Sequence, residues 1–195
     1  MTHGKFSANP QTTWLTERGA DRLMQLLQDF TFTDPDGKKW ITPKGHRVDG
    51  ASIPRPLWAL VGSPYTGNYR RASIVHDKAC EDSARNPKAR RAADRMFYHA
   101  CRAGGCTVRE TWILFLGVRI GALDEAVPAW GMGIVAAKRA RPRTSMAPAE
   151  RKLEGDFRLA SELLLKERPT DDPKHAERQV DKVLSQVANK DLRNK

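Results

Sequence analysis

The stretch RRASIVHDKACEDSARNPKARRAADRMFYHACRAGG, residues 70–105, decides the fold because it encodes two helices joined by a short turn. Apolar residues recur at about helical spacing over 73–82, which predicts the first helix. Asn86 followed by Pro87 predicts the start of the second, since Asn caps free backbone amides and Pro is tolerated at the first helical position. The Ala-Gly-Gly after Arg102 predicts its end. Two helices joined by so short a turn must pack antiparallel.

This predicted hairpin carries a His-Asp pair on its first helix and one Asp on its second. His76 and Asp94 both lie about two turns from the connecting turn, so they can face each other. An Asp bonded to one ring nitrogen of a His fixes its tautomer and makes the other nitrogen a better base. Asp77 points about 100° around the helix and can offer a carboxylate to a cation. A catalytic His76–Asp94 couple and an ordinary buried pair are both open interpretations.

The segment before the hairpin, 49–69, is rich in Pro and Gly and predicts an ordered loop. Asp49 is a second candidate metal ligand, and Ser52 could add a hydroxyl to the site. Gly62 and Gly67 could offer backbone groups to the same centre. Alternatively, Asp49 and Ser52 only form an Asx turn or cap a helix that starts just after them.

The N-terminal part predicts a flexible segment followed by short elements. Residues 1–13 are polar and predict a loose N-terminus, and the leucine spacing in 14–27 predicts a short helix. The β-rich runs 30–33 and 39–42 flank a DPDG turn, and 46–48 follows a second turn. These three runs predict an antiparallel β-meander.

The C-terminal part predicts further helices. Residues 107–121 are strongly apolar and predict a third helix inside a core domain that spans 14–137. A basic, Pro-containing stretch at 138–150 predicts a linker, and 151–195 predicts an amphipathic helical tail. The tail is either a solvated appendage or a docking element for a partner. The fold class is therefore α+β, mainly α.

The composition limits the partners. A formal net charge of +11 favours anionic partners such as a membrane surface, an acidic protein or nucleic acid. Nucleic acid is the least favoured, because the arginines of the hairpin are not interleaved with stacking aromatic residues. Those arginines are Arg70, Arg71, Arg85, Arg90, Arg91 and Arg95.

The cysteines and the apolar runs indicate the compartment. Cys80, Cys101 and Cys106 cannot all pair within one chain and lack paired metal-binding spacing, which predicts small core residues in a reducing cytosol. No N-terminal signal is evident, and no stretch approaches the roughly 20 apolar residues of a membrane span. Exposed Trp or Leu residues near 107–121 could instead hold the protein on an anionic membrane.

Three ordered blocks, VDGASIPRPLW, GSPYTGNYRRASIVHD and ADRMFYHACRAGG, resemble a domain family of unknown function encoded by phages and prophages. The resemblance covers about residues 28–130. It implies a viral or prophage setting, with the protein in the host cytoplasm or associated with the virion.

The helix pair also resembles the secreted phospholipases A2. In that family a His-Asp couple on one helix faces an Asp on an antiparallel helix, the His activates water and the adjacent Asp holds calcium. His76, Asp77 and Asp94 match these roles in order. Two departures are that Cys80 comes one residue later than the family's cysteine and that only GSPYTG could serve as the calcium loop.

Together these observations predict a phage or prophage hydrolase that acts on a phospholipid or similar ester. His76 would be the base, Asp94 its orienting partner, and Asp77, with Asp49, the calcium ligands. The alternative is a noncatalytic virion, tail or assembly component, or a protein that binds a host factor. The tail and the linker before it favour that alternative, because a small hydrolase requires neither.

Overall fold

The computed structural model describes residues 2–16, 23–48, 53–63, 65–83, 86–126 and 148–193. The chain divides into two compact units. Unit 1 comprises residues 1–52 and 62–107, and unit 2 comprises residues 53–61 and 108–195. Both units contain helices, whereas the described strands all belong to unit 1, which agrees with the predicted α+β, mainly α class.

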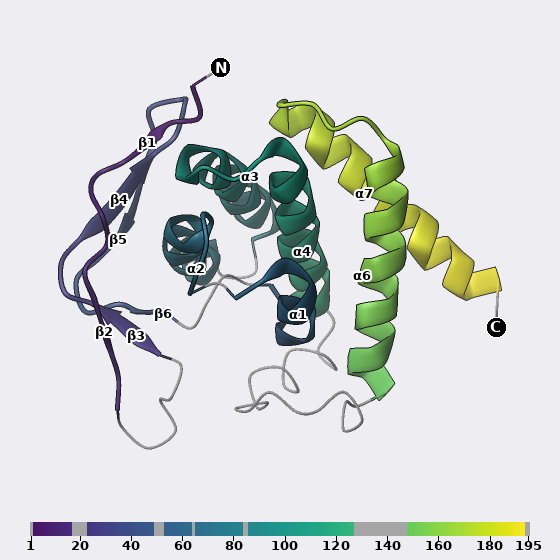
Figure 1. The fold of residues 1–195 in the computed structure, drawn as a ribbon, viewed down its shortest axis with the longest axis horizontal. Helices are drawn as coiled ribbons and strands as arrows, with labels where there is room; N and C mark the ends of the chain where they lie inside the picture. The colour runs from purple at the N-terminus through teal and green to yellow at the C-terminus, as the bar shows by residue number, and fades with distance from the viewer. Residues whose placement is uncertain are drawn as a thin grey trace. The chain divides into compact units, whose positions relative to one another are not determined.

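The first sheet of unit 1 contains the hairpin predicted around the DPDG turn. β4 (Phe30–Thr33) pairs antiparallel with β5 (Lys39–Thr42) on one side and with β1 (Lys5–Phe6) on the other (Figure 1). Asp34 fixes the turn, since its Oδ1 accepts hydrogen bonds from the Asp36 amide at 3.0 Å and the Lys38 amide at 2.9 Å. β1 lies within the segment predicted to be loose, so backbone pairing orders that part of the N-terminus.

The second sheet corrects two predictions. β3 (Met24–Leu26) pairs antiparallel with β2 (Thr12–Trp14) and with β6 (Arg47–Val48). The short helix predicted over 14–27 is therefore wrong at both described ends of that segment. The predicted three-stranded meander is also wrong, because its third strand joins β3 instead of β5. In both cases the structure depends on which separate segments pair as strands. The spacing of leucines within one segment does not indicate such pairing.

The helices of unit 1 form the predicted hairpin. α2 (Arg70–Ser83) and α3 (Pro87–Gly104) are joined by a turn in which the Asn86 side chain accepts from the amides of Lys88 and Ala89 at 3.0 and 3.1 Å. The predicted cap is thus confirmed. α2 also packs against the first sheet, where the Thr42 hydroxyl donates to the Ile74 carbonyl at 3.4 Å.

Unit 2 is helical in its described part. A 3₁₀ turn (Arg55–Leu57) leads into α1 (Trp58–Val61), and the longer helices are α4 (Val108–Ala126), α6 (Pro148–Lys166) and α7 (Pro173–Arg193). α4 is longer than the predicted 107–121. The apolar faces of the three long helices form the core, whose members include Trp112, Phe115, Leu116, Phe157, Leu164, Val180 and Val183.

The structure describes only part of the predicted linker, and it exposes only some of the apolar residues expected at a membrane surface. Most of the predicted linker, 138–147, lies outside the described residues, so that boundary stays a prediction. Of the apolar residues expected at a membrane surface, Trp112 is buried and its indole donates to the Thr170 carbonyl at 3.0 Å, whereas Leu123 is exposed. None of the described helices has the length and apolar character needed to cross a bilayer.

Candidate functional site

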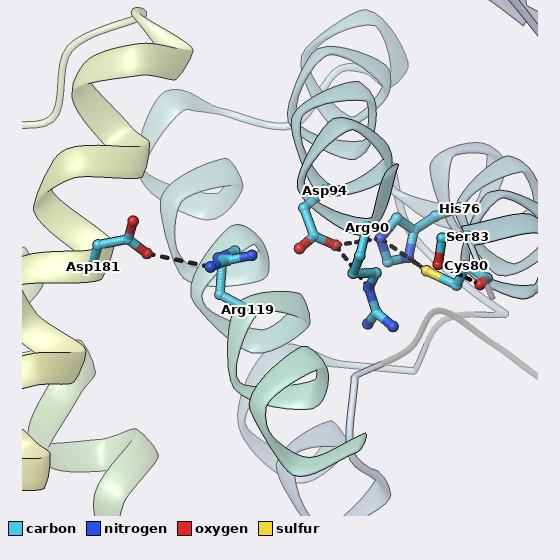
Figure 2. Close-up of polar contacts among 7 residues, drawn as sticks. All are labelled: His76, Cys80, Ser83, Arg90, Asp94, Arg119 and Asp181. Carbon is cyan, nitrogen blue, oxygen red and sulfur yellow. Dashed lines mark hydrogen bonds and ion pairs between the residues drawn. The ribbon is translucent and has the colours of Figure 1, made fainter. Parts of the chain in front are cut away.

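The α2–α3 hairpin brings the predicted pair together. The distance between His76 Nε2 and Asp94 Oδ1 is 2.9 Å, and both side chains are 0% exposed (Figure 2). His76 lies two turns before the end of α2 and Asp94 two turns into α3, so the antiparallel packing aligns them. The predicted contact is confirmed, and the catalytic role of the pair stays a prediction.

A third polar side chain, Arg90, joins this pair and was not expected there. Its Nε donates to Asp94 Oδ1 at 3.3 Å from one turn earlier on α3. Arg90 is also buried, so it offers no charged surface to the nucleic acid that was already the least favoured partner. The i, i+4 spacing of Arg90 and Asp94 was the sequence signal that could have revealed this contact. Two donors thus neutralise one buried carboxylate.

Cys80 completes the described cluster. Its sulfur lies 3.6 Å from His76 Nδ1 and 3.5 Å from Nε2, one helical turn after the histidine. A thiol directed at one nitrogen would be clearly closer to that nitrogen, so the sulfur contacts the ring without a directed bond. Cys80 is half-buried and therefore lies nearer the surface than His76, whereas Cys101 and Cys106 are buried as predicted.

The surroundings of His76 change its protonation. Burial alone lowers the pKa of the ring, because the charged form is disfavoured in the interior. The electrostatic interaction with Cys80, together with the hydrogen bond and charge of Asp94, outweighs burial and raises the pKa from 6.5 to about 9. At neutral pH the ring is therefore an imidazolium paired with Asp94, and it becomes a base only at alkaline pH.

The predicted metal ligands are only partly described. Asp49 and Ser52 lie outside the described residues. Asp77 is half-buried on α2, next to His76. Gly62 and Gly67 both have positive φ, at 90° and 75°, and the Gly62 carbonyl accepts the Tyr69 hydroxyl at 2.7 Å.

The described donors do not by themselves make a calcium site. Ligand atoms of His76, Cys80 and Asp94 all lie within 4.8 Å of one another and could hold a metal ion. A nitrogen, a sulfur and an oxygen suit zinc or a similar transition metal, whereas calcium takes six to eight oxygens. Among the described residues assigned to calcium, Asp77 alone has a carboxylate.

Tyr69 was missed by the sequence reasoning. It is buried next to the start of α2 and holds the Gly62 carbonyl. Burial, followed by the charges of Cys101 and Cys106 when ionised, raises the pKa of its hydroxyl, so Tyr69 remains a neutral donor. Its role is to fix the backbone between Gly62 and α2.

The remaining candidates do not converge on the pair. His99 is half-buried and its Nδ1 lies 3.2 Å from His3 Nδ1. Arg71 packs over the Phe6 ring, with its guanidinium carbon 4.6 Å from the ring centre. Arg70 and Arg95 are exposed. A continuous arginine surface is therefore not present among these residues.

Comparison with known proteins places this region in a wider group. Residues 24–118 match a family described as Protein of unknown function (DUF1353). The matched segment contains the described strands β3–β6 and the complete α2–α3 hairpin, so it includes His76 and Asp94. It supports an uncharacterised domain family, while the phage setting and the likeness to phospholipases A2 stay predictions.

Two relatives come from Sinorhizobium fredii (strain NBRC 101917 / NGR234). Uncharacterized protein y4jT is 43% identical over 104 residues, which cover 52% of this chain and 29% of y4jT. Uncharacterized protein y4iH is 36% identical over 105 residues, which cover 53% of this chain and 43% of y4iH. The chain thus spans less than half the length of either relative. No solved structure matches it significantly.

Proposed function

We propose that unit 1 carries a hydrolase site in which His76 is the general base and Asp94 orients it. The observation that supports this is the buried 2.9 Å contact between His76 Nε2 and Asp94 Oδ1 across two antiparallel helices. A buried carboxylate bonded to one ring nitrogen leaves the other nitrogen free to accept a proton from water. The proposed substrate is a phospholipid or similar ester.

The chemistry follows from the protonation of His76. When the ring is neutral, Nε2–H donates a hydrogen bond to Asp94 Oδ1, and Nδ1 carries the lone pair that would deprotonate a water molecule able to reach the buried ring. The imidazolium formed in that step is stabilised by the adjacent carboxylate, which Arg90 also holds in place. Because the pKa of His76 is about 9, the reactive form becomes abundant only as the pH rises toward that value.

The proposed setting rests on surface chemistry and resemblance. A net charge of +11 would draw the protein to anionic lipid. Trp14 and Leu27, on and beside the second sheet of unit 1, are 54% and 47% exposed and could enter the headgroup layer. Calcium held by Asp77, with Asp49, would polarise the ester carbonyl. A phage or prophage origin belongs to the same proposal.

The test is fatty-acid release by the full chain from phosphatidylglycerol vesicles, with calcium or with chelator, between pH 7 and pH 10. We expect activity that rises toward pH 9. His76→Gln should lower the rate by about 10²- to 10⁴-fold, the usual contribution of a general base. Asp77→Asn should remove the response to calcium.

Asp181→Asn, in unit 2, is the matched control and should keep the wild-type rate. No release under any condition would refute the proposal.

A noncatalytic role is the second candidate, because His76 and Asp94 are fully buried. The pair would then only stabilise the hairpin of a virion, assembly or host-factor-binding protein. In that case His76→Gln would lower the stability of unit 1 without changing any hydrolysis.

A further inference from the structure

A groove of about 280 Å³ lies in unit 1, between β5 and the α2–α3 hairpin. β5 forms one wall through Lys39, Trp40 and Ile41, together with Lys38 just before the strand. The helices contribute small apolar side chains, together with two polar residues at the end of α2. The helical lining consists of Val75, Ala79, Asp82, Ser83, Ala89 and Ala92. His76 and Asp94 are not among the lining residues, so the groove is distinct from the proposed hydrolase site.

The wall of this groove is a strand edge. Among the described residues β5 is an outer strand of its sheet, with β4 as its neighbour. The Asp34 amide donates to the Lys38 carbonyl at 3.0 Å, so 34 and 38 form a hydrogen-bonded pair. Such pairs alternate along an antiparallel ladder, which makes Lys39 and Ile41 the residues whose amides and carbonyls point away from β4. These groups can accept another strand.

The volume and the lining suit an extended peptide. Pockets for compact ligands usually measure about 300–1,000 Å³, so this groove is small and fits a few side chains. Alanines line the helical side and leave room for an apolar side chain beside Trp40. A strand added at a sheet edge gains affinity from main-chain bonds and specificity from pockets for alternate side chains.

The charged side chains of the groove favour a peptide of negative charge. Lys38 and Lys39 are exposed, and the Lys38 ammonium lies 3.6 Å from the centre of the Trp40 ring. Asp82, which also lines the groove, is engaged by Lys78 in an ion pair. Lysines on an edge strand discourage pairing with a second copy of the same edge, since like charges repel. They attract an acidic segment.

We infer that the groove between β5 and the α2–α3 hairpin binds an extended acidic peptide, which adds to β5 as a further antiparallel or parallel strand. Its backbone bonds to Lys39 and Ile41, an apolar side chain enters beside Trp40 and Ala79, and its carboxylates face Lys38 and Lys39. The partner is thus a protein that presents an acidic, β-prone segment.

The probe is a fluorescein-labelled peptide of alternating valine and glutamate, measured by anisotropy against the full chain. A peptide of alternating valine and lysine is the charge control. We expect saturable binding of the glutamate peptide and at least about tenfold weaker binding of the lysine peptide. In ¹⁵N spectra, the Lys39 and Ile41 amides should shift and gain exchange protection. No binding of the glutamate peptide at about 1 mM would overturn the inference.

Three variants locate the site. Ile41→Pro removes an edge amide without removing a bond to β4 and should weaken binding at least about tenfold. Lys39→Glu should weaken it by a similar factor. Lys5→Glu makes the same charge change on the exposed surface of β1 and should alter binding less than about twofold.

Equal binding by Ile41→Pro and wild type would overturn the inference, as would equal loss in Lys5→Glu and Lys39→Glu. Two other occupants are also tested. A dimer in sedimentation that Ile41→Pro dissociates would assign the groove to a second copy, and amide shifts caused by anionic vesicles but not by the peptide would assign it to lipid. Either result would overturn the assignment of the groove to an acidic peptide.

Discussion

The two helix hairpins, α2–α3 in unit 1 and α6–α7 in unit 2, begin their second helix in the same way and differ in what they bury. Asn86–Pro87 starts α3, and Asp172–Pro173 starts α7, with side-chain oxygens that accept the Lys88 and Lys174 amides at 3.0 and 2.9 Å. α6 and α7 bury mainly apolar side chains, and the buried Glu154 of α6 is bonded by Arg158 of the same helix, which is partly exposed. α2 and α3 instead enclose a His, an Asp and an Arg.

The difference shows which hairpin is specialised. Apolar burial stabilises α6–α7 without any particular partner, so many sequences could replace it. In α2–α3 each buried polar group depends on a partner, and replacing the whole set by apolar residues would often be as stable. The ion pair of Arg119 with Asp181 in unit 2, at 3.4 Å, is different again because Asp181 is partly exposed (Figure 2). The energetic cost of a buried polar centre is a reason to look for chemistry there.

The largest expected effect comes from breaking the buried centre. Asp94→Ala leaves His76 and Arg90 without their shared carboxylate and should lower the free energy of unfolding by about 3–5 kcal/mol. Asp181→Ala removes a partly exposed partner and should cost less than about 1 kcal/mol. Urea unfolding followed by circular dichroism measures both. Similar costs for the two variants would contradict the contrast between the units.

A smaller effect should follow from pH. The pKa of His76 in the folded protein, about 9, lies above its ordinary value of 6.5, so the folded state binds the proton more tightly. This contribution to stability is complete below pH 6.5 and is lost as the pH rises through about 9. Unfolding curves between pH 6 and pH 9.5 should show the decline, and His76→Gln should flatten it. An unchanged slope in that variant would assign the pH dependence to other groups.

The smallest expected effect concerns the side-chain cap that begins the second helix of both hairpins. Asn86→Ala and Asp172→Ala each remove a helix cap and should each cost about 1 kcal/mol. Chemical denaturation of the two variants beside wild type measures this. Equal costs would show that the hairpins differ inside but not at their starts, whereas a large cost at only one cap would contradict that conclusion.

Local signals predicted the helix hairpin and the β4–β5 hairpin but failed for the second sheet. Asn86 and Pro87 act on the residues next to them, so their effect can be read from the sequence. The pairing of Met24 with Val48 joins segments more than twenty positions apart, and no local pattern encodes it. Four leucines in 14–27 matched a helical spacing, although burial at 24–26 alternates as in a strand.

The candidate site was predicted in the same uneven way. His76 and Asp94 could be paired because helix geometry fixes how far each lies from the turn. Arg90 was considered only as one of six basic residues that could contact nucleic acid, yet its side chain turns inward to Asp94. Cys80 was expected in the core but is half-buried against the ring of His76. Side-chain direction in a packed interior depends on contacts that helix periodicity does not specify.

The unequal burial of the cysteines should allow one of them to be labelled selectively. Cys101 and Cys106 are enclosed, whereas Cys80 is half-buried in contact with the imidazole of His76. Brief treatment with a thiol-reactive dye should therefore modify Cys80 first and place a reporter beside His76. The fluorescence of a dye on Cys80, introduced without engineered residues, would then report when a bound molecule or a change of pH alters the surroundings of His76.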